Sequence, residues 1–172
     1  MAEAMDVEKL KNSKVIIVIP SRLDSSRLPK KALLEIDGKS LIQRVVEIAK
    51  RVRGVDDVVV ATDSHEIAEA GKASSAEIVM TTSKPRNGTE RVIEVMKQID
   101  AKYYINLQGD EPLIDTLDIE EALRTLISTN NEIVTICRPI SIKEARDPSR
   151  VKVIMSEKKK AIYFSRAIVP HN

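Results

Sequence analysis

Residues 14–19 read KVIIVI, and this short stretch decides the class of fold. Its apolar side chains are all β-branched, which favours an extended strand over a helix. A strand with one face in water alternates apolar and polar residues, whereas a strand inside a parallel sheet is apolar almost throughout. We therefore expect residues 14–19 to form a buried strand of a parallel sheet.

Around this strand, β-branched runs alternate with segments of helical spacing. The regular alternation predicts an α/β fold with a Rossmann-like, doubly wound, mainly parallel sheet and right-handed crossovers. The last segment differs, because residues 151–167 contain two extended runs around a charged turn and predict a β-hairpin. Further strands are expected at residues 57–61, 77–80, 103–107 and 132–137, and a helix at about residues 117–128.

Capping residues mark the starts of the other expected helices. Ser40 precedes an apolar helical pattern and is a candidate N-cap. Asp63 and Glu66 stand three residues apart, which is the spacing of a capping box. Asn87 and Glu90 repeat this spacing before the next apolar pattern, so a helix is expected to begin there as well.

Composition limits the classes of function. Basic and acidic residues nearly balance, 28 against 26, for a formal charge of +2, which is no electrostatic footprint for nucleic acid. Residues 1–13 form a charged leader without an apolar signal segment, and no later run reaches membrane-spanning length. We expect a cytoplasmic protein with no nucleic-acid or membrane partner. Cys137 lies in a β-branched run and is expected to be a buried core thiol.

Polar loops follow three of the expected strands, beginning at Pro20, Ser83 and Gln108. The carboxyl ends of parallel strands gather at one edge of the sheet, where ligands bind in open α/β folds. The first loop, PSRLDSSRLPKK (residues 20–31), offers Arg forks, compact Lys charges and hydroxyl groups such as that of Ser21, all suited to a triphosphate. A solvated charged loop remains the alternative.

Two further motifs suit the same ligand. Asp110, in QGDEP (residues 108–112), follows a strand and is placed to bind Mg²⁺ together with phosphates; an ordinary turn is the alternative. NGTER (residues 87–91) opens a helix whose amides could hold a polar or anionic group, although a simple helix cap explains Asn87 equally well. Together the motifs point to a nucleoside triphosphate with a divalent metal.

The motifs also resemble those of one enzyme family. IPSRLDSSRLPKKAL, VATD, NGTERV, NLQGDEP and AIYFSRAIVP, in this order, look like the motifs of 3-deoxy-D-manno-octulosonate cytidylyltransferases, the CMP-Kdo synthetases. The resemblance spans nearly the whole chain from Lys14, so residues 14–172 are expected to be the nucleotide-binding domain. It implies a Mg²⁺-dependent homodimer that transfers CMP from CTP to the acidic sugar Kdo and releases pyrophosphate, a step of lipopolysaccharide biosynthesis.

The resemblance also implies roles for single residues. Lys31, Arg22 and Asp110 are the expected catalytic residues, with Asp110 as the metal ligand. Triphosphate binding is implied for Arg22, Arg27 and Lys31, cytosine recognition for Asn87 and Gly88 with Arg91 close by, a contact near the reacting centre for Gln108, and an approach to the sugar carboxylate for Arg166.

Two departures from the family pattern bear on these expectations. Lys30 stands where the family often has Gly, so loop geometry and charge are expected to differ there. Family members also continue beyond the position of Asn172 with further sugar contacts. We therefore expect this chain to keep the edge of the sheet that binds CTP and to lack much of the Kdo pocket. The alternatives are a cytidylyltransferase for another acidic sugar, of the sialic acid or amino-Kdo type, or a non-catalytic CTP-binding subunit.

Overall fold

A computed structural model of the chain describes residues 13–23, 28–129 and 131–169. The chain divides into two compact units, unit 1 (Met1–Val134) and unit 2 (Thr135–Asn172). Unit 1 holds a four-stranded parallel sheet, and unit 2 holds a two-stranded antiparallel one. Across the described ranges, no helix combines the length and the apolar character needed to cross a membrane.

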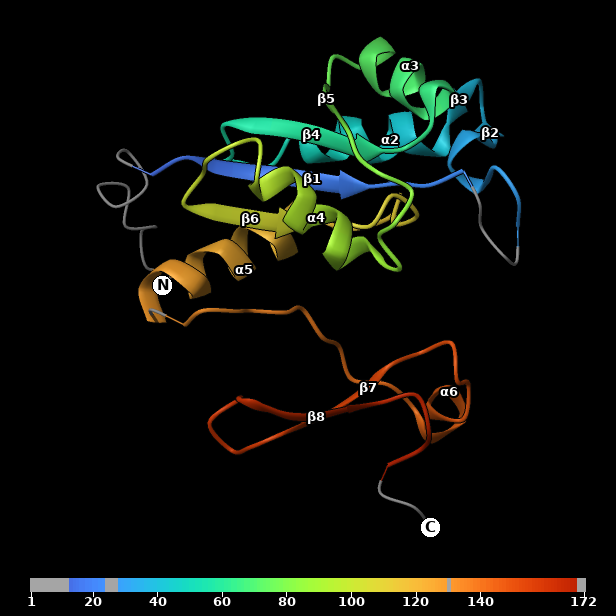
Figure 1. Cartoon of the computed structure of the whole chain (residues 1–172). Coiled ribbons are helices and arrows are strands. Elements are labelled where there is room, and N and C mark those ends of the chain that lie inside the picture. Colours follow the sequence, from blue (N-terminus) through green and yellow to red (C-terminus); the bar gives the residue numbers. More distant parts are fainter. Residues whose placement is uncertain (1–12, 24–27, 130, 170–172) are drawn as a thin grey trace. The chain divides into compact units, whose positions relative to one another are not determined.

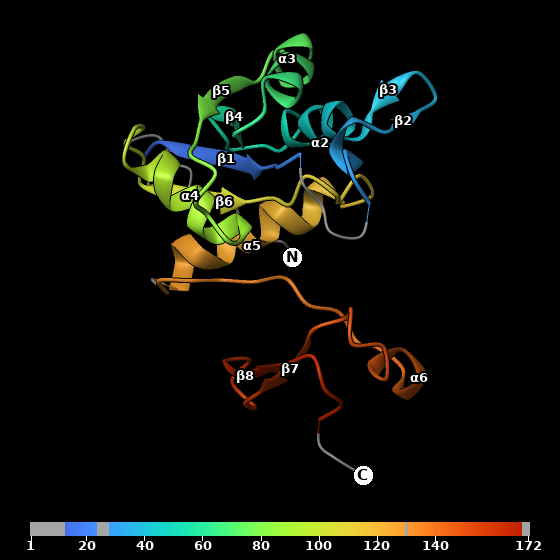
Figure 2. The same ribbon diagram turned by 45° about the vertical axis from the view of Figure 1, so that its right-hand side comes forward.

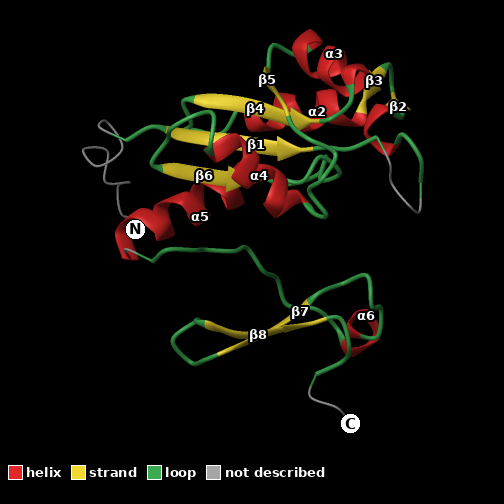
Figure 3. Ribbon diagram, viewed as in Figure 1, coloured by secondary structure: helices red, strands yellow, loops and turns green. Residues whose placement is uncertain are grey.

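The parallel sheet has the strand order β5-β4-β1-β6 (Figure 3). Every residue of β1 (Val15–Pro20) is buried, because β4 pairs along one side of it, β6 pairs along the other, and helices cover both faces. The prediction of a strand inside a parallel sheet is therefore confirmed. The other strands of this sheet are β4 (Asp57–Thr62), β5 (Glu77–Met80) and β6 (Tyr103–Asn106).

Helices cover both faces of the sheet, as the doubly wound prediction requires. Helix α2 packs on the face that carries Ile17 and Ile19. Helix α4 packs on the opposite face, where Val92 and Val95 meet Ile16 and Val18. Figures 1 and 2 show α4 in front of the sheet and α2 behind it. The helices of unit 1 are α2 (Leu41–Ala49), α3 (His65–Ala73), α4 (Gly88–Met96), α5 (Thr116–Thr129) and the short 3-10 helix η1 (Lys31–Leu33).

Two of the predicted helix caps are confirmed. The Ser40 hydroxyl accepts from the Gln43 amide, and the Gln43 side chain accepts from the Ser40 amide at 2.8 Å, which forms a capping box. The Asn87 side-chain oxygen accepts from the Glu90 amide at 2.9 Å and caps α4. Each side chain satisfies an amide that the first helical turn leaves without a partner.

The predicted cap of α3 is wrong by one residue. Ser64, rather than Asp63, is the N-cap, and its hydroxyl accepts from the Ile67 amide at 3.4 Å. Asp63 has a different partner, because its carboxylate forms an ion pair with Arg91 at 3.3 Å. Both residues are good N-caps by type, so the distant arginine decides between them.

A short hairpin that the sequence analysis did not predict lies before α2. Strands β2 (Glu35–Ile36) and β3 (Lys39–Ser40) are joined by Asp37 and Gly38, which have φ values of 47° and 72°. Positive φ at both central residues is the geometry of a two-residue hairpin turn, and Asp-Gly is a favoured pair for it. The hairpin leads the chain from the loop after β1 into α2.

Two expectations for the segment after α5 are wrong. Residues 132–137 form neither helix nor strand, and Ile133 is 85% exposed. Cys137, expected in the core, is also exposed. A β-branched run becomes a strand when another strand pairs with it, and no described strand pairs with residues 132–137.

Unit 2 contains the predicted hairpin. Strands β7 (Lys152–Met155) and β8 (Ala161–Ser165) pair antiparallel, with Val153 opposite Phe164. Helix α6 (Ile142–Ala145) precedes them and begins with a capping box between Ser141 and Glu144.

Candidate functional site

The candidate site lies at the carboxyl edge of the parallel sheet. The chain passes from β1 outward to β4 and β5, and then returns to β6 on the other side of β1. The strand order therefore reverses between β1 and β6, and in open α/β sheets such a switch point opens a crevice for ligands. The loops after these two strands contain most of the predicted site residues.

Lys31 and Asp110 meet at this edge, although 79 positions separate them in the chain. The Lys31 ammonium lies 2.8 Å from the Asp110 carboxylate, between η1 and the loop after β6. The side chains are 39% and 51% exposed, so both charges are accessible to a ligand. An exposed pair of this kind is worth at most about 1 kcal/mol. A polyanion can therefore displace Asp110 from Lys31 at little cost.

Gln108 packs closely against the start of α4. A Cβ atom on Gly88 would lie 3.0 Å from Gln108 Nε2 and 3.0 Å from Cγ of Pro20. The absence of a side chain at Gly88 therefore lets α4 approach the ends of β1 and β6. The Gln108 amide also donates to Asn106 Oδ1 at 2.8 Å, which fixes its orientation.

Ser21 lies on the same edge, directly after β1. Its backbone amide donates to the Ala61 carbonyl at 2.9 Å, and the residue is 8% exposed. A Cβ atom on Gly109 would make an ordinary contact with the Ser21 hydroxyl oxygen at 3.4 Å. Ser21, Gly88, Gln108 and the Lys31–Asp110 pair are thus gathered around one end of the sheet.

Lys30 adopts an unusual backbone conformation beside Lys31. Its φ of 54° lies in the left-handed region that glycine occupies without strain. Its side chain is directed to α3, where the ammonium pairs with Glu66 at 2.8 Å. Neighbouring lysines therefore have different partners, and Lys31 is the one that faces the loop after β6.

Arg91 is buried rather than open to a ligand. It is 3% exposed, and its guanidinium donates to Asp63 at 3.3 Å and to the Thr82 carbonyl at 3.4 Å. Asp63 was not among the predicted site residues. No local signal in the sequence marks this role, because Asp63 and Arg91 are 28 positions apart and Asp63 also suits a helix cap.

Two carboxylates of α4 are held in the ionised form by neighbouring donors. The Arg86 backbone amide and guanidinium lower the pKa of Glu90 below its usual value. The Thr82 hydroxyl and backbone amide do the same for the pKa of Glu94. Both interactions link α4 to the loop that follows β5.

Arg22, Arg27 and Arg166 complete the set of predicted site residues. Arg22 is described and exposed in the loop after β1. Arg27 lies outside the described residues. Arg166 belongs to unit 2, where its guanidinium donates to the carbonyls of Pro148 and Ser149 at 3.1 and 3.2 Å.

Asp110 suits a divalent metal that shares its ligands with a nucleotide. Within the described ranges, no group of three or more His, Cys, Asp and Glu side chains could hold a metal by itself. Metal ions at phosphate sites often bind one or two carboxylates and complete their shell with phosphate oxygens and water. An exposed carboxylate beside a lysine at the switch point fits that arrangement.

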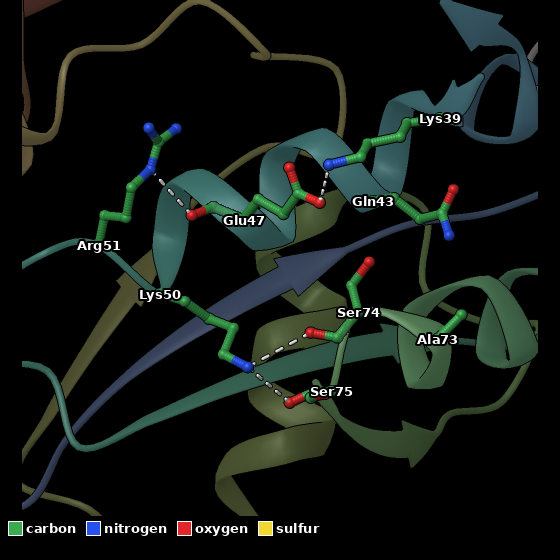
Figure 4. A pocket seen from close by; sticks show the side chains of 8 residues that line it. All are labelled: Lys39, Gln43, Glu47, Lys50, Arg51, Ala73, Ser74 and Ser75. Carbon is green, nitrogen blue, oxygen red and sulfur yellow. Dashed lines mark hydrogen bonds and ion pairs between the residues drawn. The ribbon is translucent and has the colours of Figure 1, made fainter. Parts of the chain in front are cut away.

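A surface pocket of about 580 Å³ lies elsewhere, along α2 and the end of α3 (Figure 4). Lys50 donates there to the carbonyls of Ser74 and Ser75 at 3.4 and 3.5 Å, and Lys39 pairs with Glu47 at 2.6 Å. Helices α2 and α3 end where β4 and β5 begin, so this end of the pocket faces away from the carboxyl edge. Its lining includes none of the predicted site residues, and the pocket is not part of the candidate site.

The fold and the edge together define an α/β protein with a candidate ligand site at its switch point. A sequence model of the cytidylyltransferases matches residues 16–172, and the chain belongs to this family. The doubly wound prediction and the predicted family are both confirmed.

Individual relatives are more specific. The chain is 45% identical over 160 residues to the 3-deoxy-manno-octulosonate cytidylyltransferase of Escherichia coli, covering 92% of this chain and 65% of that protein. It is 45% identical over 159 residues to the enzyme of the same name from Chlorobium limicola, covering 90% and 64%. The solved structure of a CMP:2-keto-3-deoxy-manno-octonic acid synthetase complexed with CTP matches with a TM-score of 0.82 at 43% identity, covering 92% of this chain and 66% of that one. The chain thus spans about 65% of the length of the E. coli relative.

Proposed function

We propose that this chain carries the CTP-binding part of a cytidylyltransferase that transfers CMP from CTP to the anomeric hydroxyl of Kdo, giving CMP-Kdo and pyrophosphate. The observation that carries the proposal is the meeting of Lys31 and Asp110 at the switch point. The relative solved with CTP and the curated Kdo cytidylyltransferases support the choice of nucleotide and sugar.

Lys31 is proposed to bind the triphosphate. When CTP enters, its phosphate oxygens replace the Asp110 carboxylate as the partner of the Lys31 ammonium. Arg22, exposed in the loop after β1, offers a planar fork to the same phosphates, and Arg27 is proposed to join it. Catalysis of this transfer depends mainly on positioning and charge neutralisation, which these cations supply.

Asp110 is proposed to hold Mg²⁺ together with the phosphates of CTP. The ion, when bound, neutralises negative charge on the triphosphate and on the leaving pyrophosphate. Asp110 contributes an exposed carboxylate that Lys31 already keeps at the edge. Gln108, fixed by Asn106, is proposed to contact the reacting centre.

The start of α4 is proposed to receive the cytosine. The Asn87 side-chain oxygen accepts from the Glu90 amide and the Asn87 carbonyl accepts from the Arg91 amide, so the backbone amides of Asn87 and Gly88 are proposed as the contacts for the base. Arg166 is proposed to approach the carboxylate of Kdo. The guanidinium has five N–H donors, of which the structure uses one nitrogen for the carbonyls of unit 2.

The homodimer and the cytoplasmic location stay predictions. Sedimentation of the purified chain tests the first, and fractionation of cells that express it tests the second. Neither outcome bears on the nucleotide site itself.

The deciding experiment measures pyrophosphate release from CTP, Mg²⁺ and Kdo beside a calorimetric titration with CTP. UTP in place of CTP controls for the base, and a sialic acid in place of Kdo tests the other acidic sugar. We expect CTP binding, and release that requires Kdo. Binding without release would favour a CTP-binding subunit, and the absence of CTP binding would refute the proposal.

A further inference from the structure

Asp63, Arg91 and the β5–α4 loop form a small hydrogen-bonded network around the buried Arg91 side chain. Arg91 is 3% exposed, and its guanidinium donates to the Asp63 carboxylate at 3.3 Å, to the Thr82 carbonyl at 3.4 Å and to the Thr81 hydroxyl. Asp63 follows β4, and Thr81 and Thr82 follow β5. One guanidinium in α4 is therefore tied to the ends of two parallel strands.

The strand ends that hold Arg91 are themselves firmly placed. The Thr81 amide donates to the Thr62 carbonyl at 2.8 Å, and the Thr62 hydroxyl accepts from the Ser64 amide at 3.1 Å. Thr62 is completely buried. Asp63 lies between Thr62 and Ser64, so the backbone from which its side chain extends is held in place at the edge of the sheet.

The segment that this network holds is the first turn of α4. The Arg91 amide donates to the Asn87 carbonyl at 3.3 Å, which closes that turn. Gly88 in the same turn lies against the side chain of Gln108 and the ring of Pro20. A shift of Arg91 would therefore move Gly88 relative to Gln108.

We propose that Asp63 is a positioning residue that, through Arg91, fixes the first turn of α4 against Gln108 at the edge of the sheet. The proposal rests on the proposed function, because this turn is where the cytosine of CTP is expected to bind. Asp63 acts through Arg91 and does not touch the nucleotide. A weakly held turn would bind CTP less tightly, because binding would have to order it.

The test compares Asp63→Asn and Arg91→Lys with the parent chain. Asp63→Asn removes the charge and keeps the shape, and Arg91→Lys keeps the charge and removes the fork that reaches three acceptors. Arg86→Gln is the matched control, because Arg86 lies in the same loop but its pair with Glu90 is exposed, with 86% of the Arg86 side chain in solvent. Two measurements are made on each chain: amide hydrogen exchange without ligand, and calorimetric titration with CTP and with UTP.

Faster exchange is expected in both variants at the Glu90 and Arg91 amides, which donate to the side chain and the carbonyl of Asn87, with unchanged exchange in β1 and in the Arg86→Gln control. CTP affinity is expected to fall on the order of fivefold to tenfold, as for the loss of about one hydrogen bond. The ratio of CTP to UTP affinity should change less than the affinity itself, because Asp63 does not contact the base.

Other outcomes overturn the proposal. Unchanged exchange at the Glu90 and Arg91 amides would show that Asp63 does not hold this turn, and a lower affinity with unchanged exchange would make Asp63 or Arg91 a direct ligand. Faster exchange throughout the sheet would show that the Asp63–Arg91 pair stabilises the fold in general and does not specifically position α4. If the parent chain failed to bind CTP, the proposed function would fall, and the exchange result would still decide whether Asp63 positions α4.

Discussion

Lys31 and Asp110 lie 2.8 Å apart at the point where the strand order of the sheet reverses. The positive charge of Lys31 suits a triphosphate, and the carboxylate of Asp110 suits a metal ion bound to that triphosphate. In the free protein each neutralises the other. Ligand binding would therefore exchange this ion pair for two new ones, from lysine to phosphate and from carboxylate to metal.

Replacing Lys31 by Ala is expected to weaken CTP binding. A hydrogen bond to a charged group contributes about 1.5–3 kcal/mol, so the dissociation constant should rise by roughly one to two orders of magnitude. Calorimetry measures the change. Lys30→Ala is the control, because the Lys30 ammonium pairs with Glu66 instead and its loss should leave affinity nearly unchanged. If the two substitutions changed the affinity for CTP equally, Lys31 would not be part of the binding site.

Replacing Asp110 by Ala is expected to abolish the Mg²⁺ dependence of CTP binding. The substitution also frees Lys31 and removes a negative charge beside the triphosphate, so binding without metal should be as strong as in the parent chain or stronger. Titrations with CTP in Mg²⁺ and in EDTA measure both effects. Glu111→Gln removes the neighbouring carboxylate as a control. Mg²⁺ dependence that survives in Asp110→Ala would assign the metal to another ligand.

Replacing Gly88 by Ala is expected to weaken CTP binding without unfolding the chain. The new Cβ would lie 3.0 Å from Gln108 Nε2 and from Cγ of Pro20, so the Gln108 side chain or the start of α4 must shift. Gly71→Ala is the matched control, because its Cβ would meet the end of the Ile78 side chain, at 2.9 Å, away from the edge. Thermal unfolding and CTP titration of both variants separate stability from binding. A loss of affinity in Gly71→Ala alone would contradict the role of Gly88.

Much of unit 1 could be predicted from the sequence because its signals are local. The strand expected at residues 77–80 is β5, and Ser40 and Asn87 cap helices where expected. A run of β-branched residues predicts a strand, and a polar residue before an apolar helical pattern predicts a helix cap. Both predictions use neighbouring residues only. The meeting of Lys31 and Asp110 could be predicted to the level of a shared edge, because parallel strands end together.

The parts that could not be predicted depend on distant partners. Asp63 and Ser64 are equally good caps by type, and the choice between them depends on Arg91, 28 positions away. Residues 132–137 have the composition of a strand, yet a strand exists by pairing, and no described strand pairs with them. Residue type alone also cannot distinguish Lys30 from Lys31, which face different partners.

The last prediction concerns Glu144 in unit 2. The Ser141 amide, the Arg138 guanidinium and the Ser141 hydroxyl all donate to its carboxylate and lower its pKa from 4.5 to about 2. Because the pKa is lower in the folded chain, the carboxylate stabilises the start of α6 above pH 4.5, and this contribution is lost as the pH falls from 4.5 to about 2. Arg138→Gln should raise the pKa of Glu144 toward its usual value, and an NMR titration of the carboxyl carbon measures it.

Arg146→Gln is the control for this titration, because the Arg146 side chain forms no ion pair within the described part of unit 2. The pKa of Glu144 should stay near that of the parent chain in this variant, and the protection of the Glu144 amide by Ser141 should be lost on acidification at the same pH as in the parent. In Arg138→Gln the protection should be lost at a higher pH, since protonation then begins earlier. A common midpoint in the two variants would show that the Arg138 guanidinium does not hold the Glu144 carboxylate in solution.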